Sequence, residues 1–265
     1  MKKLQNLTHL RYLTLILLAL LSIQLISGCN SSKTDINTDD PEKAFSIAKR
    51  KYDKKDYVDA IDDFSFIKIR FPGTDVSDRV QYYLANSYYY QKEYILAAYE
   101  FESFLKNYQM SPLYSEAKYM LGNTYYELSP KYSLDQEFTK EALNQYLSFI
   151  ETYPQDKNVA EADRKIKELR NKLAYKDFWT AELYMKTDNY KAASLYYQAV
   201  YDDYIDSEWA DDAMVGQAEA YLNGKKYEDG KRVLEKFYKL FPNSNIRKKA
   251  DLIKSKIREN QLSGN

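Results

Sequence analysis

The chain has 265 residues, of which 39 are Lys or Arg and 39 are Asp or Glu, so its formal net charge is zero. A balanced charge gives no overall field that would draw the protein to nucleic acid. Its only histidine, His9, and its only cysteine, Cys29, both lie near the N-terminus, so the rest of the sequence has neither His–Cys metal sites nor His-activated nucleophiles. The seven glycines lie too far apart to form a phosphate-binding loop.

After these exclusions, the only enzymatic chemistry that the sequence could support is catalysis by a pair of carboxylates, as in a glycosidase. Most acidic residues are interleaved with lysines, a pattern typical of solvated helix faces. We therefore expect no enzymatic activity, no metal and no cofactor. The protein is expected to act by binding.

The first 28 residues have the composition of an export signal. Three basic residues, Lys2, Lys3 and Arg11, accompany an apolar run from Leu13 to Ile26. The run is too short for a permanent membrane span, and polar sequence follows it. Removal of this segment takes away three basic residues and no acidic one, which leaves 36 basic against 39 acidic residues and a net charge of −3.

The segment Ile26-Ser27-Gly28-Cys29 resembles the bacterial lipobox, in which small residues precede a cysteine that receives diacylglycerol. Ile26 stands where the usual pattern has Leu. We predict that residues 1–28 are a lipoprotein signal peptide and that Cys29 carries diacylglycerol and an acyl chain such as palmitate. Acylation explains a lone exported cysteine without a disulfide partner in the chain. An ordinary signal peptide with an incidental cysteine is the alternative.

Residues 29–40 are polar after the cysteine and contain no aromatic residue, so we expect a flexible tether between the lipid and the folded domain. Several acyl chains hold a protein at a membrane far more firmly than one chain does. Asn30 follows Cys29 at the position where Asp is the usual signal for retention in the inner membrane. The predicted location is therefore the outer membrane, on its periplasmic face, through the lipid on Cys29.

An aromatic residue recurs five times in one sequence context, at Phe71, Tyr108, Tyr153, Tyr204 and Phe241. Each of these aromatic residues follows a small residue by eleven positions and apolar residues by seven and four positions. At these spacings the residues lie on one stripe of an α-helix. Three positions after each aromatic residue stands a typical helix-capping residue, so the next helix is predicted to begin there. These residues are Thr74, Ser111, Asp156, Ser207 and Ser244.

The five aromatic residues are 37, 45, 51 and 37 positions apart, near the roughly 34 residues of a tetratricopeptide repeat. We predict an all-α fold, an α-solenoid of five tetratricopeptide-like helix–turn–helix repeats. Repeats 1–3 occupy residues 41–156, and residues 157–265 hold repeats 4–5 and a C-terminal helix. An irregular helical bundle with accidental periodicity is the alternative.

Two insertions lengthen the spacing. The first is a predicted loop from Ser129 to Gln136, in which Pro130 ends one helix and Asp135 caps the next. The second lies before repeat four, where Val159 to Lys186 contains no Gly or Pro. A single helix of roughly 40 Å is predicted there, at 1.5 Å per residue, as a rigid spacer that joins the two sub-domains.

The first helix of each repeat lines the concave groove of a tetratricopeptide array. The first three repeats place an aromatic residue, an amide or ammonium group and a second aromatic residue along that groove. An amide both donates to and accepts from a peptide backbone, and tyrosines offer flat apolar area. We predict a site for an extended peptide, with packing of the tyrosines between repeats as the alternative. The candidate residues are Phe45, Lys49, Tyr52, Tyr82, Asn86, Tyr89, Tyr119, Asn123 and Tyr126.

Two further stretches of the sequence are informative, LSPKYSLDQEFTKEAL and NKLAYKDFWTAELYMKTDNYKAA. Together with the lipobox and the five repeats, they resemble the BamD family, lipoproteins of the outer-membrane β-barrel assembly machinery. The resemblance runs from Pro41 to about Lys256. It implies an anchor in the outer membrane, a C-terminal half that docks on the periplasmic domains of the barrel protein BamA, and an N-terminal groove for unfolded outer-membrane protein segments. A periplasmic tetratricopeptide scaffold for polysaccharide export or cell-wall machinery is the alternative, although both insertions favour the BamD family.

Overall fold

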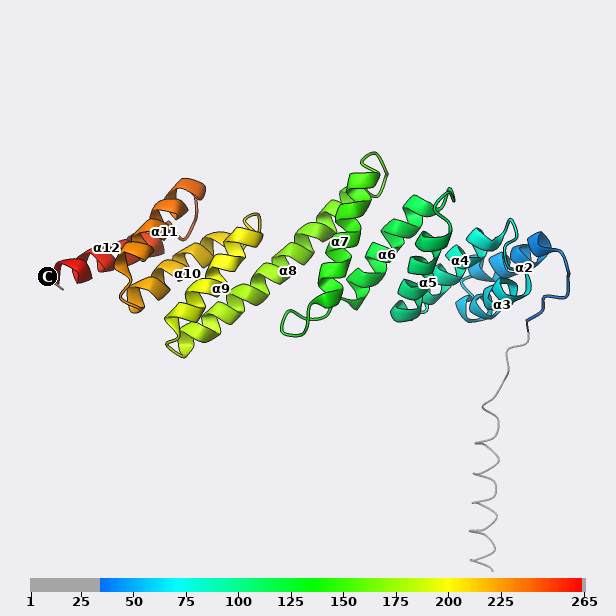
Figure 1. Ribbon diagram of the computed structural model, residues 1–265, viewed down its shortest axis with the longest axis horizontal. Coiled ribbons are helices and arrows are strands. Elements are labelled where there is room, and N and C mark those ends of the chain that lie inside the picture. Colours follow the sequence, from blue (N-terminus) through cyan, green and yellow to red (C-terminus); the bar gives the residue numbers. More distant parts are fainter. Residues whose placement is uncertain (1–33, 264–265) are drawn as a thin grey trace, which may run out of the picture. The chain divides into compact units, whose positions relative to one another are not determined.

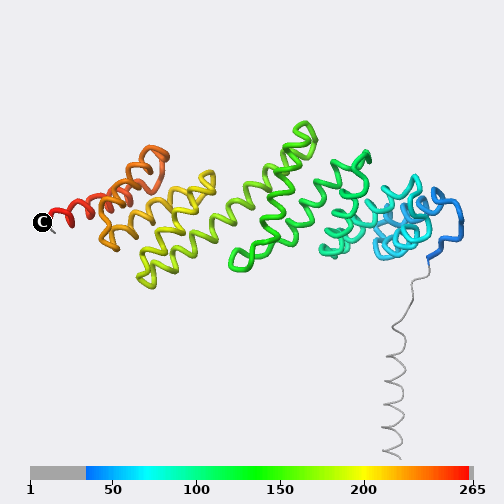
Figure 2. Tube along the Cα trace, in the orientation of Figure 1, coloured from blue at the N-terminus to red at the C-terminus, as the bar shows by residue number. Residues whose placement is uncertain are grey.

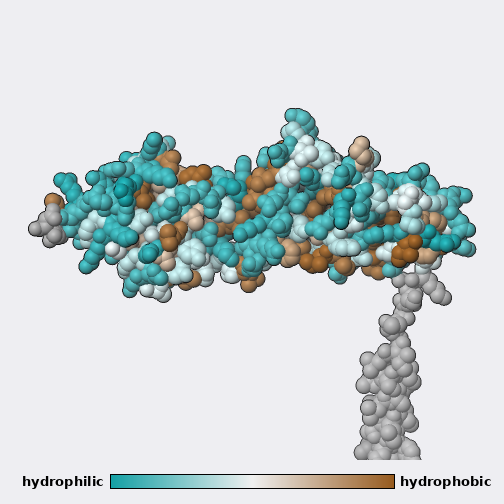
Figure 3. Space-filling model, viewed as in Figure 1, coloured by the Kyte–Doolittle hydropathy of each residue, from teal (hydrophilic) through white to brown (hydrophobic). Residues whose placement is uncertain are grey.

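The computed structural model describes residues 34–263, so the predicted signal peptide and Cys29 lie outside the described residues. Every regular element in that range is an α-helix (Figures 1 and 2), which confirms the all-α prediction. The helices are α2 (Pro41–Asp53), α3 (Tyr57–Arg70), α4 (Ser77–Tyr90), α5 (Tyr94–Asn107), α6 (Tyr114–Leu128), α7 (Glu137–Thr152), α8 (Val159–Lys186), α9 (Tyr190–Asp203), α10 (Ala210–Asn223), α11 (Tyr227–Leu240) and α12 (Arg247–Ser263). None of them combines the length and apolarity needed to cross a membrane, and hydrophilic residues cover much of the face shown in Figure 3.

The chain divides into two compact units, residues 1–74 and residues 75–265. In the described part of the first unit, α2 begins at Pro41 because the Asp40 carboxylate accepts the backbone N–H of Glu42 at 3.0 Å and that of Lys43 at 3.2 Å. The helix packs on α3 through Phe45, whose ring lies 6.0 Å from that of Phe64.

A buried ion pair also joins α2 to α3. Asp63 of α3 is 0% exposed, and Lys51 Nζ lies 2.8 Å from its carboxylate. Burial alone would lower the pKa of Lys51, but the hydrogen bond and the charge of Asp63 outweigh it and raise that pKa. Removal of Lys51 would leave a buried, uncompensated carboxylate, which is strongly destabilising.

Residues 34–40, which the sequence analysis placed in the tether, contact the first repeat. The side chain of Ile36 is buried. Asp35 lies 3.6 Å from Lys51, and Asp39 lies 2.9 Å from Arg70. Exposed ion pairs contribute little to stability, whereas full burial of an isoleucine contributes about 1.5–3 kcal/mol. The contacts of the folded domain therefore begin before residue 41.

In the second unit, each helix from α4 to α12 packs against the next one along the chain (Figure 1). The buried apolar residues form two clusters, one from Tyr82 to Leu173 and the other from Ala174 to Ile257. The two clusters meet within α8, because its first half buries Ala162 and Leu169 against the earlier repeats. The boundary predicted from the sequence, between residues 156 and 157, lies before the start of α8.

The predicted long helix is confirmed, since α8 runs without interruption from Val159 to Lys186. The predicted insertion loop is also present, because α6 ends at Leu128 and the Asp135 carboxylate accepts the backbone N–H of Glu137 at 2.8 Å. Gln136 holds this loop together. Its buried side-chain amide donates to the carbonyl oxygens of Lys131 at 2.9 Å and of Leu134 at 3.0 Å.

The predicted helix starts are wrong by three residues. The helices that follow the five recurring aromatic residues begin at Ser77, Tyr114, Val159, Ala210 and Arg247. The physical reason is a turn that precedes each helix: the side chain of Ser111, for example, accepts the N–H of Leu113 at 3.2 Å. The Ser111 hydroxyl also donates to the Asp78 carboxylate at 2.7 Å, so it links two consecutive repeats.

Several tyrosines have a raised pKa in the folded protein, so its stability is expected to depend on pH at high pH. Burial raises the pKa of Tyr201 to about 12, and a hydrogen bond to Glu168 together with burial raises that of Tyr126 to about 12. An unfolded phenol has a pKa of about 10, so these groups stabilise the fold fully below pH 10 and less as the pH rises through the folded values. We expect a constant urea midpoint from about pH 7 to 9 and a falling one above about pH 10. A midpoint unchanged at about pH 11.5 would contradict this.

Candidate functional site

The predicted groove residues belong to both units. In the first unit, Phe45 is buried against Phe64 and therefore packs in the core of the repeat. Lys49 Nζ lies 2.5 Å from the Asp53 carboxylate and 5.6 Å from the centre of the Tyr52 ring. Lys49 and Tyr52 are partly exposed, so they offer a cation and an aromatic face at the surface of α2.

On α4 the predicted residues are mostly buried. Asn86 is 3% exposed, and its amide donates to the backbone carbonyl of Tyr82 at 2.9 Å. Tyr82 is buried as well, with its ring centre 5.9 Å from that of Phe104. Tyr89 is partly exposed, and burial is the main cause that raises its pKa. The Asn86 amide thus makes a hydrogen bond within its own helix.

On α6 the side chains of the predicted site meet the first turns of α8. The carbonyl oxygen of Asn123 accepts from the Tyr146 hydroxyl at 2.7 Å and from Lys165 Nζ at 2.6 Å. The Tyr126 hydroxyl donates to the Glu168 carboxylate at 2.6 Å. Tyr119 packs with its ring centre 5.4 Å from that of Phe149. Asn123 and Tyr126 therefore lie in one polar cluster with residues of α8.

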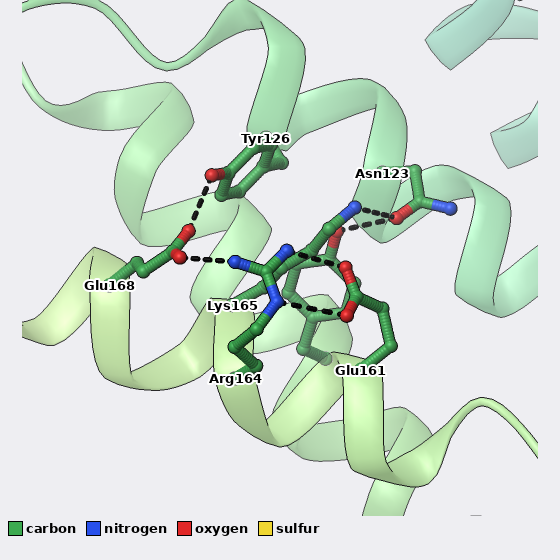
Figure 4. Close-up of polar contacts among 7 residues, drawn as sticks. Asn123, Tyr126, Glu161, Arg164, Lys165 and Glu168 are labelled. Atoms are coloured by element: carbon green, nitrogen blue, oxygen red, sulfur yellow. Dashed lines mark hydrogen bonds and ion pairs between the residues drawn. The ribbon is translucent and has the colours of Figure 1, made fainter.

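Lys165 is the cation of this cluster that contacts Asn123 (Figure 4). Its ammonium group lies 4.7 Å from the centre of the Tyr126 ring and 5.7 Å from that of Tyr146. Burial lowers the pKa of Lys165, although nearby carboxylates partly offset this. Cation–π contacts and one amide oxygen hold the charge in place of a carboxylate.

Arg164, the neighbour of Lys165, engages the two carboxylates on this face of α8. Its guanidinium donates to Glu161 at 2.9 Å and also contacts Glu168 (Figure 4). Because Arg164 pairs with both carboxylates, the ammonium group of Lys165 contacts the Asn123 amide oxygen and the tyrosine rings instead. The cluster can recognise an oxygen acceptor, such as a peptide carbonyl or carboxylate, beside flat aromatic surface.

Lys165 is not among the residues predicted from the sequence, because the pattern of α8 indicated only a spacer helix. Glu161, Arg164, Lys165 and Glu168 are spaced so that they share one helix face, a pattern that the sequence shows. The contact of Lys165 with Asn123, however, spans 42 residues. Only the way in which α8 packs on the third repeat brings them together.

The insertion loop lies against the middle of α8. Lys172 Nζ donates to the Ser129 hydroxyl at 2.8 Å, and Lys176 Nζ donates to the carbonyl oxygen of Leu134 at 2.8 Å. A cleft of about 540 Å³ lies beside this contact, lined by residues of the loop, α7, α8 and α9. Asp177 lines it, and its pKa is raised by burial and by the nearby charge of Asp203.

The stacked helical hairpins, with small residues where helices touch, define a tetratricopeptide-repeat protein, and residues 212–244 match the sequence model of such a repeat. The chain belongs to the YfiO family of outer membrane lipoproteins, whose sequence model matches residues 37–225. This family corresponds to the BamD resemblance seen in the sequence. The family and the fold are typical of scaffold proteins that bind other proteins. A search of curated proteins found no match to the chain.

Similar solved structures share low identity with the chain. The TPR2AB domain of yeast Sti1 is 12% identical, with 82% of this chain and 98% of that chain covered and a TM-score of 0.40. A tetratricopeptide repeat protein from Parabacteroides merdae is 15% identical, with 83% and 92% covered and a TM-score of 0.38. A putative kinesin light chain of Podosopora anserina is 11% identical, with 77% and 97% covered and a TM-score of 0.37. These likenesses add nothing to the family assignment.

Proposed function

We propose that this protein is a lipid-anchored periplasmic scaffold of the outer-membrane β-barrel assembly machinery. In this proposal it binds the barrel assembly protein BamA with its C-terminal half and segments of unfolded outer-membrane proteins with its N-terminal repeats. The observation that carries the proposal is the match of residues 37–225 to a family of outer membrane lipoproteins. Repeat arrays of this kind act by offering extended surfaces to other proteins.

The membrane anchor of the proposal rests on Cys29, which lies outside the described residues. Its support is the run of small residues before the only cysteine in the chain. The family description, outer membrane lipoprotein, agrees with such an anchor and with the outer membrane as its location. The contacts of residues 34–40 would then hold the first repeat only a few residues away from the lipid along the chain.

The client site of the proposal centres on Asn123, Tyr126 and Lys165. An incoming peptide carbonyl would replace the Asn123 oxygen as acceptor for Lys165, and the freed amide would bond to the next peptide group. Tyr126 is partly exposed and would pack on the peptide side chains. The exchange keeps each buried polar group paired, so it costs little.

Binding of a labelled, unfolded outer-membrane protein segment tests this proposal. The wild-type protein is expected to bind it, and an Asn86→Ala/Asn123→Ala variant is expected to bind about tenfold more weakly, since one or two hydrogen bonds of about 1 kcal/mol each are lost. Fluorescence anisotropy at fixed salt would measure the affinity. The matched control is Asn107→Ala/Asn223→Ala, which removes two exposed amides at the ends of α5 and α10.

Since Asn123 is buried, the melting temperature of the double variant must be compared with that of the wild type. Should it fall, Lys165→Met serves instead, because it removes the cation and keeps both amides. Unaltered affinity in a folded variant of either kind would refute the client site.

A further inference from the structure

A second surface of interest lies at the C-terminal end of the array, between α11 and α12. A groove of about 490 Å³ runs between these helices, a size within the range of roughly 300–1,000 Å³ found for ligand sites. Residues of α11 form one wall and residues of α12 form the other. The lining residues that matter are Lys231, Leu234, Asp251, Lys254, Ile257 and Arg258.

The floor of the groove is apolar. Leu234 of α11 and Ile257 of α12 line it and are both almost fully buried. The two helices approach closely because Gly230 has no side chain, and a methyl group at that position would lie 2.8 Å from the Ile257 side chain. Neighbouring side chains already cover most of both residues, so an apolar side chain of a ligand would touch only their edges and would pack mainly on the methylene groups of the lysines and the arginine that line the groove.

The rim of the groove is basic. Lys231, Lys254 and Arg258 line it, are exposed, and form no ion pair within residues 34–263. The lining has one carboxylate, Asp251, and its oxygen already accepts from the Tyr238 hydroxyl at 2.6 Å. Three cations against one carboxylate give the lining a net charge of +2.

The charge of α12 as a whole has the same sign. Residues 247–263 contain six Lys or Arg and two Asp or Glu, a net charge of +4. The mature chain as predicted is acidic overall, at −3, so the basic charge is concentrated on this helix. A terminal helix that only covers the end of a repeat array needs a polar outer face, which residues of either sign supply. A role for α12 in covering the end of the array therefore does not explain why most of its charged residues are basic.

We propose that the groove between α11 and α12 is a docking site for an acidic peptide segment of a partner protein. An apolar side chain of the segment packs on the edges of Leu234 and Ile257 and on the methylene groups of the rim, and its flanking carboxylates pair with Lys231, Lys254 and Arg258. Charge complementarity selects the partner and speeds its association, and the apolar floor supplies the burial that holds it. The C-terminal half that the proposed function assigns to BamA includes these two helices. The inference goes beyond that function because it assigns a defined groove and a ligand chemistry to α11 and α12, which both begin after residue 225, where the family match ends.

The test uses the full mature lipoprotein in detergent and a fluorescent, end-capped peptide of twelve residues in which each of two leucines is flanked by glutamates. We expect the groove variant Lys231→Gln/Lys254→Gln/Arg258→Gln to bind this peptide at least about tenfold more weakly than the wild type. The matched control, Lys239→Gln/Lys248→Gln/Lys256→Gln, removes the same charge from exposed positions of α11 and α12 outside the groove. It is expected to change the affinity less than about twofold.

A second peptide with serine in place of both leucines tests the floor and is expected to bind about tenfold more weakly than the first. The proposal is overturned by a wild type that binds neither peptide, by equal losses in the two triple variants, or by equal affinity for the two peptides. Vesicles that contain phosphatidylglycerol form a further arm. If only vesicle binding depends on the groove cations, the surface serves a membrane and the peptide proposal is wrong. Where the triple variant melts at a lower temperature, the single variant Arg258→Glu replaces it.

Discussion

Replacement of Tyr146 by alanine is expected to lower the free energy of unfolding by about 3–5 kcal/mol, the usual cost of an aromatic-to-alanine change in a core. Tyr146 is 0% exposed, and its ring fills the space left by Gly122, where a methyl group would lie 2.8 Å from the ring. Its hydroxyl also donates to Asn123 at 2.7 Å. The change therefore leaves a cavity and removes a hydrogen bond from the cluster that holds Lys165.

Two control variants separate these effects. Tyr146→Phe keeps the ring and is expected to cost only about 1–2 kcal/mol, for the lost hydroxyl and the amide oxygen left with one donor. Tyr99→Ala removes a tyrosine that is 64% exposed and is expected to change stability by less than about 0.5 kcal/mol. Urea denaturation followed by circular dichroism would measure all three. A loss below about 1 kcal/mol for Tyr146→Ala would show that the third repeat is packed differently.

Replacement of Cys29 by serine is expected to release the protein from the membrane. The predicted anchor consists of several acyl chains, and each buried CH₂ group contributes about 0.8 kcal/mol, so two or more chains bind far beyond the marginal affinity of one. Without the thiol neither diacylglycerol nor the acyl chain can be attached. Fractionation of cell envelopes after a wash at high salt would show the wild type in the membrane pellet and Cys29→Ser in the soluble fraction.

The matched control for this experiment is Ser31→Ala, which changes a neighbouring residue and keeps the thiol. It is expected to remain in the pellet. If Cys29→Ser pellets as completely as the wild type, while its helix content shows that it is folded, then lipid on Cys29 is not what holds the protein.

The repeat architecture was predictable because it depends on local properties of the sequence. An unbroken run without Gly or Pro defined α8 from Val159 to Lys186, and Pro130 and Asp135 bounded the insertion loop. The helix starts were misplaced for a local reason too. The hydroxyl of Ser111 closes a turn instead of capping the helix, and a sequence pattern does not distinguish these two roles.

The candidate site was less predictable, because its geometry depends on contacts between repeats. The periodicity places Asn86 and Asn123 on the correct helices, yet successive residues of a helix point about 100° apart, so the pattern does not show whether a side chain faces the groove or the next repeat. Asn123 meets Lys165 only because α8 packs on the third repeat. The role of the groove residues in peptide binding therefore stays a prediction.

The N-terminal segment shows the same limit. The composition of residues 34–40 is that of a polar linker, and one apolar residue, Ile36, is too weak a signal to indicate docking. In the structure Ile36 is buried and Asp39 pairs with Arg70. Contacts of single side chains with a preformed surface are not visible in a composition.

Affinity purification of the full-length tagged protein from envelopes solubilised in mild detergent tests whether this protein acts as a membrane-bound scaffold of barrel assembly. The bound proteins would be quantified against an untagged strain. We expect a near-stoichiometric partner that combines a membrane β-barrel with soluble periplasmic domains. Enrichment of polysaccharide-export or cell-wall proteins, with no such barrel protein, would show that the protein serves a different machinery.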